Sequence, residues 1–274
     1  MRSKLFVPCS RPELFAKALA SAADALSFDL EDAVPESGKA EARNALADLL
    51  RSDAIRHSPK TLIVRVNGLG TAHFAADVAA LAGCRVDLVN LPKAERASDV
   101  HDAVSALPAA MTADLLVNIE TALGLSNAVE IAGSHPRVAG LQVGLNDLFA
   151  ALQIDRGDER HGHAALWSIR VASGAAGRFA YDGAWPDLRD EDGFRREAEL
   201  ARSLGYRGKS CIHPRQVPIA NAVFDTDSAR IAARRLLAAA AAAEAEGRGA
   251  FTLDGKMIDR PAIEQARALL DSQP

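Results

Sequence analysis

Short runs of apolar, often β-branched residues alternate along this chain with longer stretches in which apolar residues recur at helical spacing. A helix-length segment follows each run; the first covers residues 12–23, with Ser10 as the expected N-cap and Pro12 in the first turn. Parallel strands need crossovers of this kind, so the pattern predicts βα units and a parallel sheet. The predicted strands cover residues 4–8, 25–30, 61–66, 87–91, 115–119, 138–143, 178–181 and 209–212.

The number of these units favours a closed (β/α)8 TIM barrel, in which eight parallel strands are each followed by a helix. The predicted strands are nearly continuous apolar runs, as expected when both faces of the sheet are covered. A six-stranded doubly wound sheet is the alternative. It is disfavoured because no GxGxxG pattern follows the first strand, where a dinucleotide-binding fold would place its phosphate loop.

The chain continues beyond the eighth unit. An Ala-rich helix is predicted over residues 228–246, followed by a glycine-containing turn at 247–249, a mixed segment at 251–261 and a last amphipathic helix. We therefore expect a catalytic barrel over residues 1–224 and a C-terminal helical extension over residues 225–274. The Gly-rich corners suggest a lid that folds over a rim or packs on an adjacent subunit.

Composition narrows the classes of partner. With 32 Lys and Arg against 36 Asp and Glu, a net charge of −4 supplies no basic excess for nucleic acid. The N-terminal apolar run is too short for a signal peptide, and the Ala-rich helix falls short of the roughly 20 apolar residues that a bilayer requires. Three cysteines without CxxC spacing fit a reducing compartment. We expect no nucleic acid or membrane partner and a cytoplasmic location.

Polar residues follow nearly every predicted strand. In parallel α/β barrels the active site forms at the carboxyl ends of the strands, so these residues are the first candidates for chemistry. They are Asp29, Glu31 and Asp32; Arg65 and Asn67; Pro92 and Lys93; Asn118 and Glu120; Asn146 and Asp147 after Gly144; Asp182; and Ser210 and His213.

Carboxylates that converge on one rim need positive charge among them. Arg65 supplies one such charge, and a divalent cation would supply the rest. Glu120 and Asp147 are the best candidate ligands, because carboxylates without His or thiolate partners suit Mg²⁺ or Mn²⁺. The alternative is that each carboxylate caps the helix that follows its strand.

Six motifs in order along the chain resemble the citrate lyase β-subunit-like (CitE-like) branch of the HpcH/HpaI aldolase superfamily. The resemblance runs from Arg2 to the C-terminal extension. Its motifs are RSKLFVP (2–8) with SRPE (10–13), FDLEDAV (28–34), VRVNG (64–68), NIET (118–121), GLNDL (144–148) and GKSCIHP (208–214). One departure is Cys9, where the family more often has glycine.

The resemblance implies a Mg²⁺-dependent barrel that makes or breaks a carbon–carbon bond beside an acyl-CoA thioester. Glu120 and Asp147 would be the metal ligands, and Arg65 would bind the substrate oxygen and the developing enolate. The segment GKMIDRP (255–261) is similar to that of malyl-CoA and citramalyl-CoA lyases, in which the aspartate matching Asp259 acts as acid/base from an adjacent subunit's lid. We therefore expect a homotrimer or hexamer.

The remaining candidate roles follow from these expectations. Glu31 is expected among the catalytic residues with Arg65 and Asp259; with Asp32, it would orient metal-bound water rather than bind the metal. Arg65 would otherwise be a rim salt bridge. Substrate contacts are expected from Arg65, Asn67 and Lys93 and, in the GLNDL motif, from Gly144 and Asn146.

Several other residues are expected to have no direct part in catalysis. Lys93 and Lys209 are interpreted as solvated rim charges, with a CoA phosphate contact as the alternative. His161 and His163 are placed in a solvated, charged loop rather than in a metal site, and Cys211 is expected to be buried and inert.

The leading hypothesis is therefore a lyase that cleaves malyl-CoA or citramalyl-CoA to acetyl-CoA and a 2-keto acid, glyoxylate or pyruvate, or that runs the reverse condensation. A malyl-CoA thioesterase and the citryl-CoA-cleaving β subunit of citrate lyase are alternatives within the family. A barrel that binds acyl-CoA without turning it over is the alternative from another class.

Overall fold

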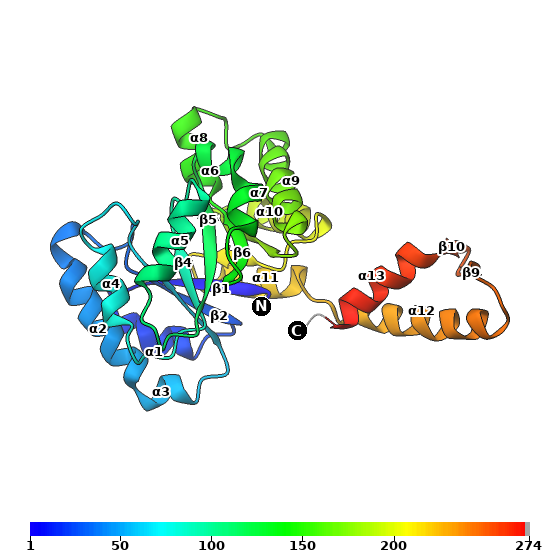
Figure 1. Ribbon diagram of the computed structural model, residues 1–274, viewed down its shortest axis with the longest axis horizontal. Helices are drawn as coiled ribbons and strands as arrows, with labels where there is room; N and C mark the ends of the chain where they lie inside the picture. Colours follow the sequence, from blue (N-terminus) through cyan, green and yellow to red (C-terminus); the bar gives the residue numbers. More distant parts are fainter. Residues whose placement is uncertain (272–274) are drawn as a thin grey trace. The chain divides into compact units, whose positions relative to one another are not determined.

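Eight parallel strands close into a barrel in the computed structural model, which describes residues 1–271 (Figure 1). Each strand pairs with its neighbours in chain order, and β8 closes the barrel by pairing with β1. The predicted (β/α)8 barrel is confirmed. Its strands are β1 (Ser3–Pro8), β2 (Ala25–Asp29), β3 (Thr61–Arg65), β4 (Leu88–Leu91), β5 (Asp114–Ile119), β6 (Val138–Val143), β7 (Phe179–Ala184) and β8 (Lys209–Cys211).

Helices connect successive strands and cover the outside of the barrel (Figure 1). They are α1 (Phe15–Leu19), α2 (Lys39–Arg51), α3 (Asp53–Arg56), α4 (Phe74–Ala80), α5 (Ala97–Ala106), α6 (Ala122–Ser126), α7 (Ala128–Gly133), α8 (Leu145–Leu152), α9 (Glu159–Ala175), α10 (Glu191–Ser203) and α11 (Gln216–Val223), with short 3₁₀ turns at Pro12–Leu14 and Glu36–Gly38.

The first helix is shorter than the pattern predicts. Residues 12–23 form a 3₁₀ turn and the five-residue α1, and the N-cap position falls on Arg11. The expected cap of Ser10 is wrong, because its hydroxyl donates instead to the carbonyl oxygen of Ala33, 2.9 Å away, and so joins the loops after β1 and β2.

The barrel interior is layered. Near the amino ends of the strands it is filled by an apolar cluster of Ala25, Ile63, Leu88, Leu116 and Tyr181. A polar layer that includes Lys4, Asn90 and Gln142 comes next, in which both Lys4 and Asn90 donate to the Gln142 amide oxygen. The apolar cluster fills the interior near the amino ends, which leaves the carboxyl ends of the strands, where the active sites of parallel barrels form.

Residues on the outward face of the strands pack under the helices. All five positions of β2 are buried, with Leu26 and Phe28 in the main hydrophobic core and Ser27 among the buried polar residues. Burial of both faces explains why the strands appear in the sequence as continuous apolar runs rather than as alternating patterns.

The chain divides into two compact units, Met1–Phe224 and Asp225–Pro274. In the second unit, α12 (Asp227–Ala245) packs along α13 (Arg260–Asp271), and a hairpin of β9 (Phe251–Leu253) and β10 (Lys256–Ile258) joins them (Figure 1). The two turn residues, Asp254 and Gly255, have φ of 51° and 77°. Asp-Gly is a strong hairpin signal, and it was available in the sequence.

Within residues 1–271, no helix combines the length and the apolar character that crossing a lipid bilayer would demand.

Candidate active site

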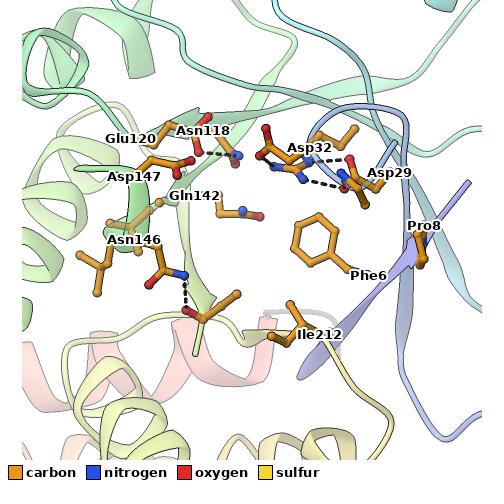
Figure 2. A pocket seen from close by; sticks show the side chains of 16 residues that line it. Phe6, Pro8, Asp29, Asp32, Asn118, Glu120, Gln142, Asn146, Asp147 and Ile212 are labelled. Carbon is orange, nitrogen blue, oxygen red and sulfur yellow. Dashed lines mark hydrogen bonds and ion pairs between the residues drawn. The ribbon is translucent and has the colours of Figure 1, made fainter. Parts of the chain in front are cut away.

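A cavity of about 450 Å³ opens at the carboxyl ends of the barrel strands. Figure 2 shows two groups of polar side chains around it. Asn118, Glu120 and Asp147 lie together on one side, and Asp29 and Asp32 lie on the other, with Phe6 and Gln142 between the groups. Arg65, Gly144 and Asn146 also line the cavity. The structure thus brings together most of the residues that the sequence predicted from separate strands.

Glu120 is the buried carboxylate of the first group. It follows directly after β5, and only 4% of its surface is exposed. Its Oε1 accepts a hydrogen bond of 2.9 Å from the backbone N–H of Lys93, whereas its Oε2 has only a long contact of 3.4 Å with the amide nitrogen of Asn118. One carboxylate oxygen is therefore anchored and the other is weakly held.

The surroundings of Glu120 disfavour its charge. Burial and the nearby negative charges of Glu31 and Asp147 together raise the pKa of its carboxyl to about 7, against the opposing effect of Arg65. Asp147, in the first turn of α8, is exposed and makes no hydrogen bond or ion pair with any residue that the structure describes. This side of the cavity carries negative charge that the protein itself leaves uncompensated.

Gly144 allows the close approach of the two strand ends that carry these carboxylates. A Cβ at Gly144 would lie 2.4 Å from the Cβ of Glu120 and 2.6 Å from its Oε2. A side chain is therefore excluded here by the Glu120 side chain itself, so the expected substrate-contact residue Gly144 also shapes the position of Glu120.

Arg65 dominates the second group. It ends β3, opposite Asp29 in the register of the neighbouring strand β2. Its Nε and Nη2 donate to the two oxygens of Asp29 at 2.8 and 2.6 Å, and its Nη1 lies 2.8 Å from Glu31 and 3.1 Å from Asp32. The guanidinium carbon lies 5.1 Å from the centre of the Phe6 ring. Arg65 is therefore fixed in place before any ligand arrives.

Electrostatics agree with that geometry. Burial disfavours the charged form of Arg65, but the charge and hydrogen bonds of Asp29 outweigh this cost and raise its pKa. Burial raises the pKa of the Glu31 carboxyl, although the charges of Arg65 and Lys93 oppose the shift. Lys93 reaches Glu31 at 2.8 Å, and this contact helps to raise the pKa of Lys93.

The expected rim residues Glu31 and Lys93 thus pair with each other. Neither is among the described residues that line the cavity.

Asn67, expected to contact substrate, is not among the described residues that line the cavity. It is 3% exposed, and its amide is used within the protein. The amide nitrogen donates to Asp77 at 2.6 Å, and the amide oxygen accepts from Lys39 at 2.6 Å. Because Lys39 also binds the carbonyl oxygens of Leu30 and Glu31, Asn67 has a structural role in holding the loop after β2.

Lys209 is not a solvated rim charge. It is fully buried, and its ammonium lies 2.7 Å from both Asp182 and Glu197. Strand β7 extends through Asp182, which therefore lies inside the strand rather than after it. The alternative of a CoA phosphate contact at Lys209 is disfavoured as well, because carboxylates from β7 and α10 surround the ammonium.

The cysteines, the two histidines and Asp259 lie in different environments. Cys211 is fully buried, as predicted. His161 and His163 are exposed as expected, but they lie in the first turns of α9 rather than in a loop. Cys9 is also fully buried, and its backbone does not adopt the left-handed conformation that would favour glycine. Asp259 lies in the second unit, between β10 and α13.

Phe6, Asn118 and Gln142 also line the cavity, and the sequence pattern indicates a specific role for none of them. Alternation along β1 is the available signal, because residues 4, 6 and 8 share one face of a strand and Lys4 would be costly on an outer apolar face. No comparable signal exists for Gln142, whose direction depends on the barrel's closure.

The donor set fits a hard divalent cation. Glu120 and Asp147 supply oxygen ligands on the side where negative charge is in excess, and a bound cation would favour the ionised form of Glu120. Within residues 1–271, no group of three or more His, Cys, Asp or Glu side chains could hold a metal by itself. Two carboxylates suit Mg²⁺, which commonly takes its remaining ligands from water and substrate.

Comparisons with known proteins agree with this arrangement. The chain is 40% identical over 271 residues to a (3S)-malyl-CoA thioesterase of Cereibacter sphaeroides, covering 98% of this chain and 93% of the relative. It is 36% identical over 299 residues to an L-malyl-CoA/beta-methylmalyl-CoA lyase of the same species, covering 98% and 93% of the two chains.

A solved structure is similar over the whole chain. It is protein CitE from Mycobacterium tuberculosis in complex with magnesium, acetoacetate and coenzyme A, at 36% identity, a TM-score of 0.79 and 98% coverage of both chains. The family described as HpcH/HpaI aldolase/citrate lyase matches residues 2–214. The chain therefore belongs to the HpcH/HpaI aldolase/citrate lyase family.

Proposed function

We propose that this protein is a Mg²⁺-dependent carbon–carbon lyase that acts on a 3-hydroxyacyl-CoA. Malyl-CoA or citramalyl-CoA would give acetyl-CoA and glyoxylate or pyruvate, and the reverse condensation would use the same site. The observation that carries the proposal is a single cavity lined by the fixed guanidinium of Arg65 and by the carboxylates of Glu120 and Asp147.

Cleavage of the bond between C2 and C3 of such a substrate leaves an enolate on the acyl side and a carbonyl on the other. Arg65 is suited to the enolate oxygen because its charge is permanent and its donors are fixed. A guanidinium has five N–H donors, of which Asp29 uses two. The rest lie toward Glu31, Asp32 and the cavity.

Mg²⁺ held by Glu120 and Asp147 would supply Lewis-acid polarisation of the keto-acid oxygen and a template for its carboxylate. The remaining roles belong to this chain's own side chains. Asn146 and Gly144 border the keto-acid end of the cavity, and Glu31 fixes Arg65 and Lys93 at the rim. As the C2–C3 bond breaks, the C3 hydroxyl would lose its proton to a carboxylate of the cavity and Asp259 would donate a proton to the enolate carbon, so that no proton is gained or lost overall; the condensing direction reverses both transfers.

We place Asp259 on a lid contributed by an adjacent subunit in a homotrimer or hexamer. The support is its position after β10 in a separate unit of the chain, together with the resemblance of residues 255–261 to those of the lyases. Lid closure would exclude water from the enolate. A cytoplasmic location is supported by three free cysteines.

A malyl-CoA thioesterase is the second candidate, favoured by the 40% identity to a relative of that name. The two activities differ in the bond that breaks. A lyase releases acetyl-CoA and a keto acid, whereas a thioesterase releases free CoA and the hydroxy acid.

The deciding experiment incubates the purified protein and Mg²⁺ with malyl-, citramalyl- and citryl-CoA and separates the thioester products. Acetyl-CoA formed with one keto acid per turnover is the expected result. Free CoA as the first product would assign the thioesterase instead, and turnover of none of the three would contradict both. Glu120→Gln is the negative control, and Arg196→Ala, on the exposed face of α10, is the matched surface control.

A further inference from the structure

Arg156 contacts Asn146, a residue that lines the cavity, without lining the cavity itself. It lies in the loop between α8 and α9 and is not among the described residues that line the cavity. Its Nε donates to the amide oxygen of Asn146 at 3.2 Å, and its guanidinium carbon lies 4.9 Å from the centre of the Trp185 ring. Asn146 itself lines the cavity, next to Asp147 in the first turn of α8 (Figure 2).

This contact fixes which end of the Asn146 amide faces the ligand. A guanidinium only donates hydrogen bonds. The Asn146 amide can therefore pair with Arg156 only in the orientation that presents its oxygen to the guanidinium. The amide nitrogen then points toward the carbonyl oxygen of Ala184, 3.4 Å away, which also borders the cavity. That long contact takes one of the two N–H groups, and the other has no partner among the residues that the structure describes.

Arg156 is in turn held by the barrel wall. Its Nη2 forms an ion pair of 2.5 Å with Oε2 of Glu197 on α10, a residue that is 7% exposed. The other oxygen of Glu197 lies 2.7 Å from the ammonium of Lys209, which also binds Asp182 at 2.7 Å. Charged groups from β7, β8 and α10 thus fix the guanidinium that fixes Asn146.

We propose that Arg156 is a positioning residue that sets Asn146 as a hydrogen-bond donor to an oxygen acceptor in the cavity. The matching ligand group is the carboxylate or carbonyl oxygen of a small 2-keto acid. The inference rests on the proposed function for the identity of that ligand, but the orientation of Asn146 rests on the contacts alone.

A double-mutant cycle tests the coupling. Calorimetric titration of pyruvate in the presence of Mg²⁺ is compared for wild type, Arg156→Ala, Asn146→Ala and the double variant. We expect each single change to weaken pyruvate binding about tenfold, the size of one lost hydrogen bond to a charged ligand. We expect the double variant to bind no more weakly than Asn146→Ala. Equal losses from Arg156→Ala in both backgrounds would overturn the proposal.

The variant Arg156→Lys distinguishes a loss of the Asn146 contact from a general loss of folding. Lysine keeps the charge against Glu197 but lacks a second arm for Asn146, so we expect an unchanged Tm and weakened pyruvate binding. Full binding by Arg156→Lys would overturn the assignment. Arg196→Ala is the matched control, because among the described residues Arg196 forms an ion pair with the exposed Glu159 alone, so its loss should leave pyruvate binding unchanged.

A ligand-free measurement separates this inference from the proposed function. In protein labelled with ¹⁵N-asparagine, the side-chain signal of Asn146 is identified by its loss in Asn146→Ala. We expect that signal to shift in Arg156→Lys and to stay unchanged in Arg196→Ala. An Asn146 signal that does not move in Arg156→Lys would overturn the positioning role. If the signal does move in Arg156→Lys but the wild-type protein binds neither pyruvate nor glyoxylate, the result would count against the proposed function alone.

Discussion

Arg65 and Asp29 meet in two parallel contacts, Nε to Oδ1 at 2.8 Å and Nη2 to Oδ2 at 2.6 Å, from facing positions on adjacent strands. Both side chains are nearly buried, with 11% and 3% of their surface exposed. The register of β2 against β3 therefore aligns the guanidinium before substrate binds, and the rotamer entropy of Arg65 is lost on folding rather than during catalysis.

Replacing Arg65 tests this pre-alignment. Arg65→Lys keeps one charge but cannot form both contacts with Asp29, so we expect kcat to fall by about 100-fold or more, as on loss of an oxyanion donor. Steady-state kinetics with whichever of malyl-, citramalyl- or citryl-CoA the wild type cleaves measures the change. Arg11→Lys, in an exposed ion pair with Glu13, is the matched control and should keep wild-type kcat. A kcat for Arg65→Lys within threefold of wild type would contradict the role.

Removing the guanidinium entirely has a structural consequence. Arg65→Ala leaves the buried Asp29 carboxylate without its partner, and we expect the free energy of unfolding to fall by about 3–5 kcal/mol. Urea denaturation monitored by circular dichroism measures this change. The double variant Arg65→Ala/Asp29→Asn should recover part of the loss, because it removes the unpaired charge; no recovery would show that the pair does not act as a unit.

The raised pKa of Glu120 predicts that the stability of the metal-free protein depends on pH. This pKa is about 7 in the folded chain against an ordinary value of 4.5, so between these values the native state holds a proton that the unfolded state has lost. Stability from this group is complete below pH 4.5 and declines as the pH rises toward 7.

Thermal melts from pH 5 to 8, with chelator, should therefore show a decline in Tm that is shallower in Glu120→Gln. Identical profiles for the two proteins would refute the assignment.

Mg²⁺ should compete with that proton. Below pH 7 the ion must displace the proton from Glu120, so we expect the apparent Mg²⁺ affinity to rise with pH and to level off above about 7. Calorimetry in buffers of different ionisation enthalpy measures both the affinity and the protons released. Glu120→Gln should bind Mg²⁺ at least about tenfold more weakly, and an affinity that does not change between pH 5.5 and 8 would contradict the ligand role.

Gly144 provides a steric test of the same site. In Gly144→Ala the new Cβ would overlap the Glu120 side chain, so we expect displacement of that carboxylate and weaker Mg²⁺ binding. Gly70→Ala is the matched control, because a Cβ there meets nothing within 4 Å and the backbone is not left-handed. Calorimetric titration of both variants with Mg²⁺ should separate them, and equal affinities would argue against the proximity of Gly144 to the metal site.

The proposed lid predicts complementation between chains. Arg65→Ala and Asp259→Ala should each be inactive alone. If one active site takes Arg65 from one subunit and Asp259 from another, mixed oligomers prepared by co-expression should regain part of the wild-type activity. Activity assays on mixtures separated by two affinity tags measure this. No recovery in verified mixed oligomers would place both residues in the same chain's site.

The alternation of strands and helices could be predicted from the sequence because a strand that is buried on both faces consists of consecutive apolar residues. β2, for example, is buried at every position and appears as an uninterrupted apolar run. The carboxyl-end rule then located Arg65, Glu120 and Asp147 from chain position alone. The hairpin at Asp254 and Gly255 is also indicated by its turn residues, although residues 251–261 were expected only as a mixed segment.

Side-chain direction was not accessible in the same way. Arg65 and Asn67 are two residues apart after the same strand, yet Arg65 borders the cavity and Asn67 is enclosed by Lys39 and Asp77. Nothing in the local pattern distinguishes them, because the partners that fix each side chain come from other βα units.

The eight βα units, the family and the rim that carries the polar residues could thus be predicted from the amino-acid sequence, since they depend on local periodicity and on short motifs. The burial of Lys209 between Asp182 and Glu197 and the contact of Arg156 with Asn146 became visible in the folded chain alone. A charge is stable inside a barrel wall only when its partners converge in space, and that convergence is a property of the closed sheet rather than of neighbouring residues in the chain.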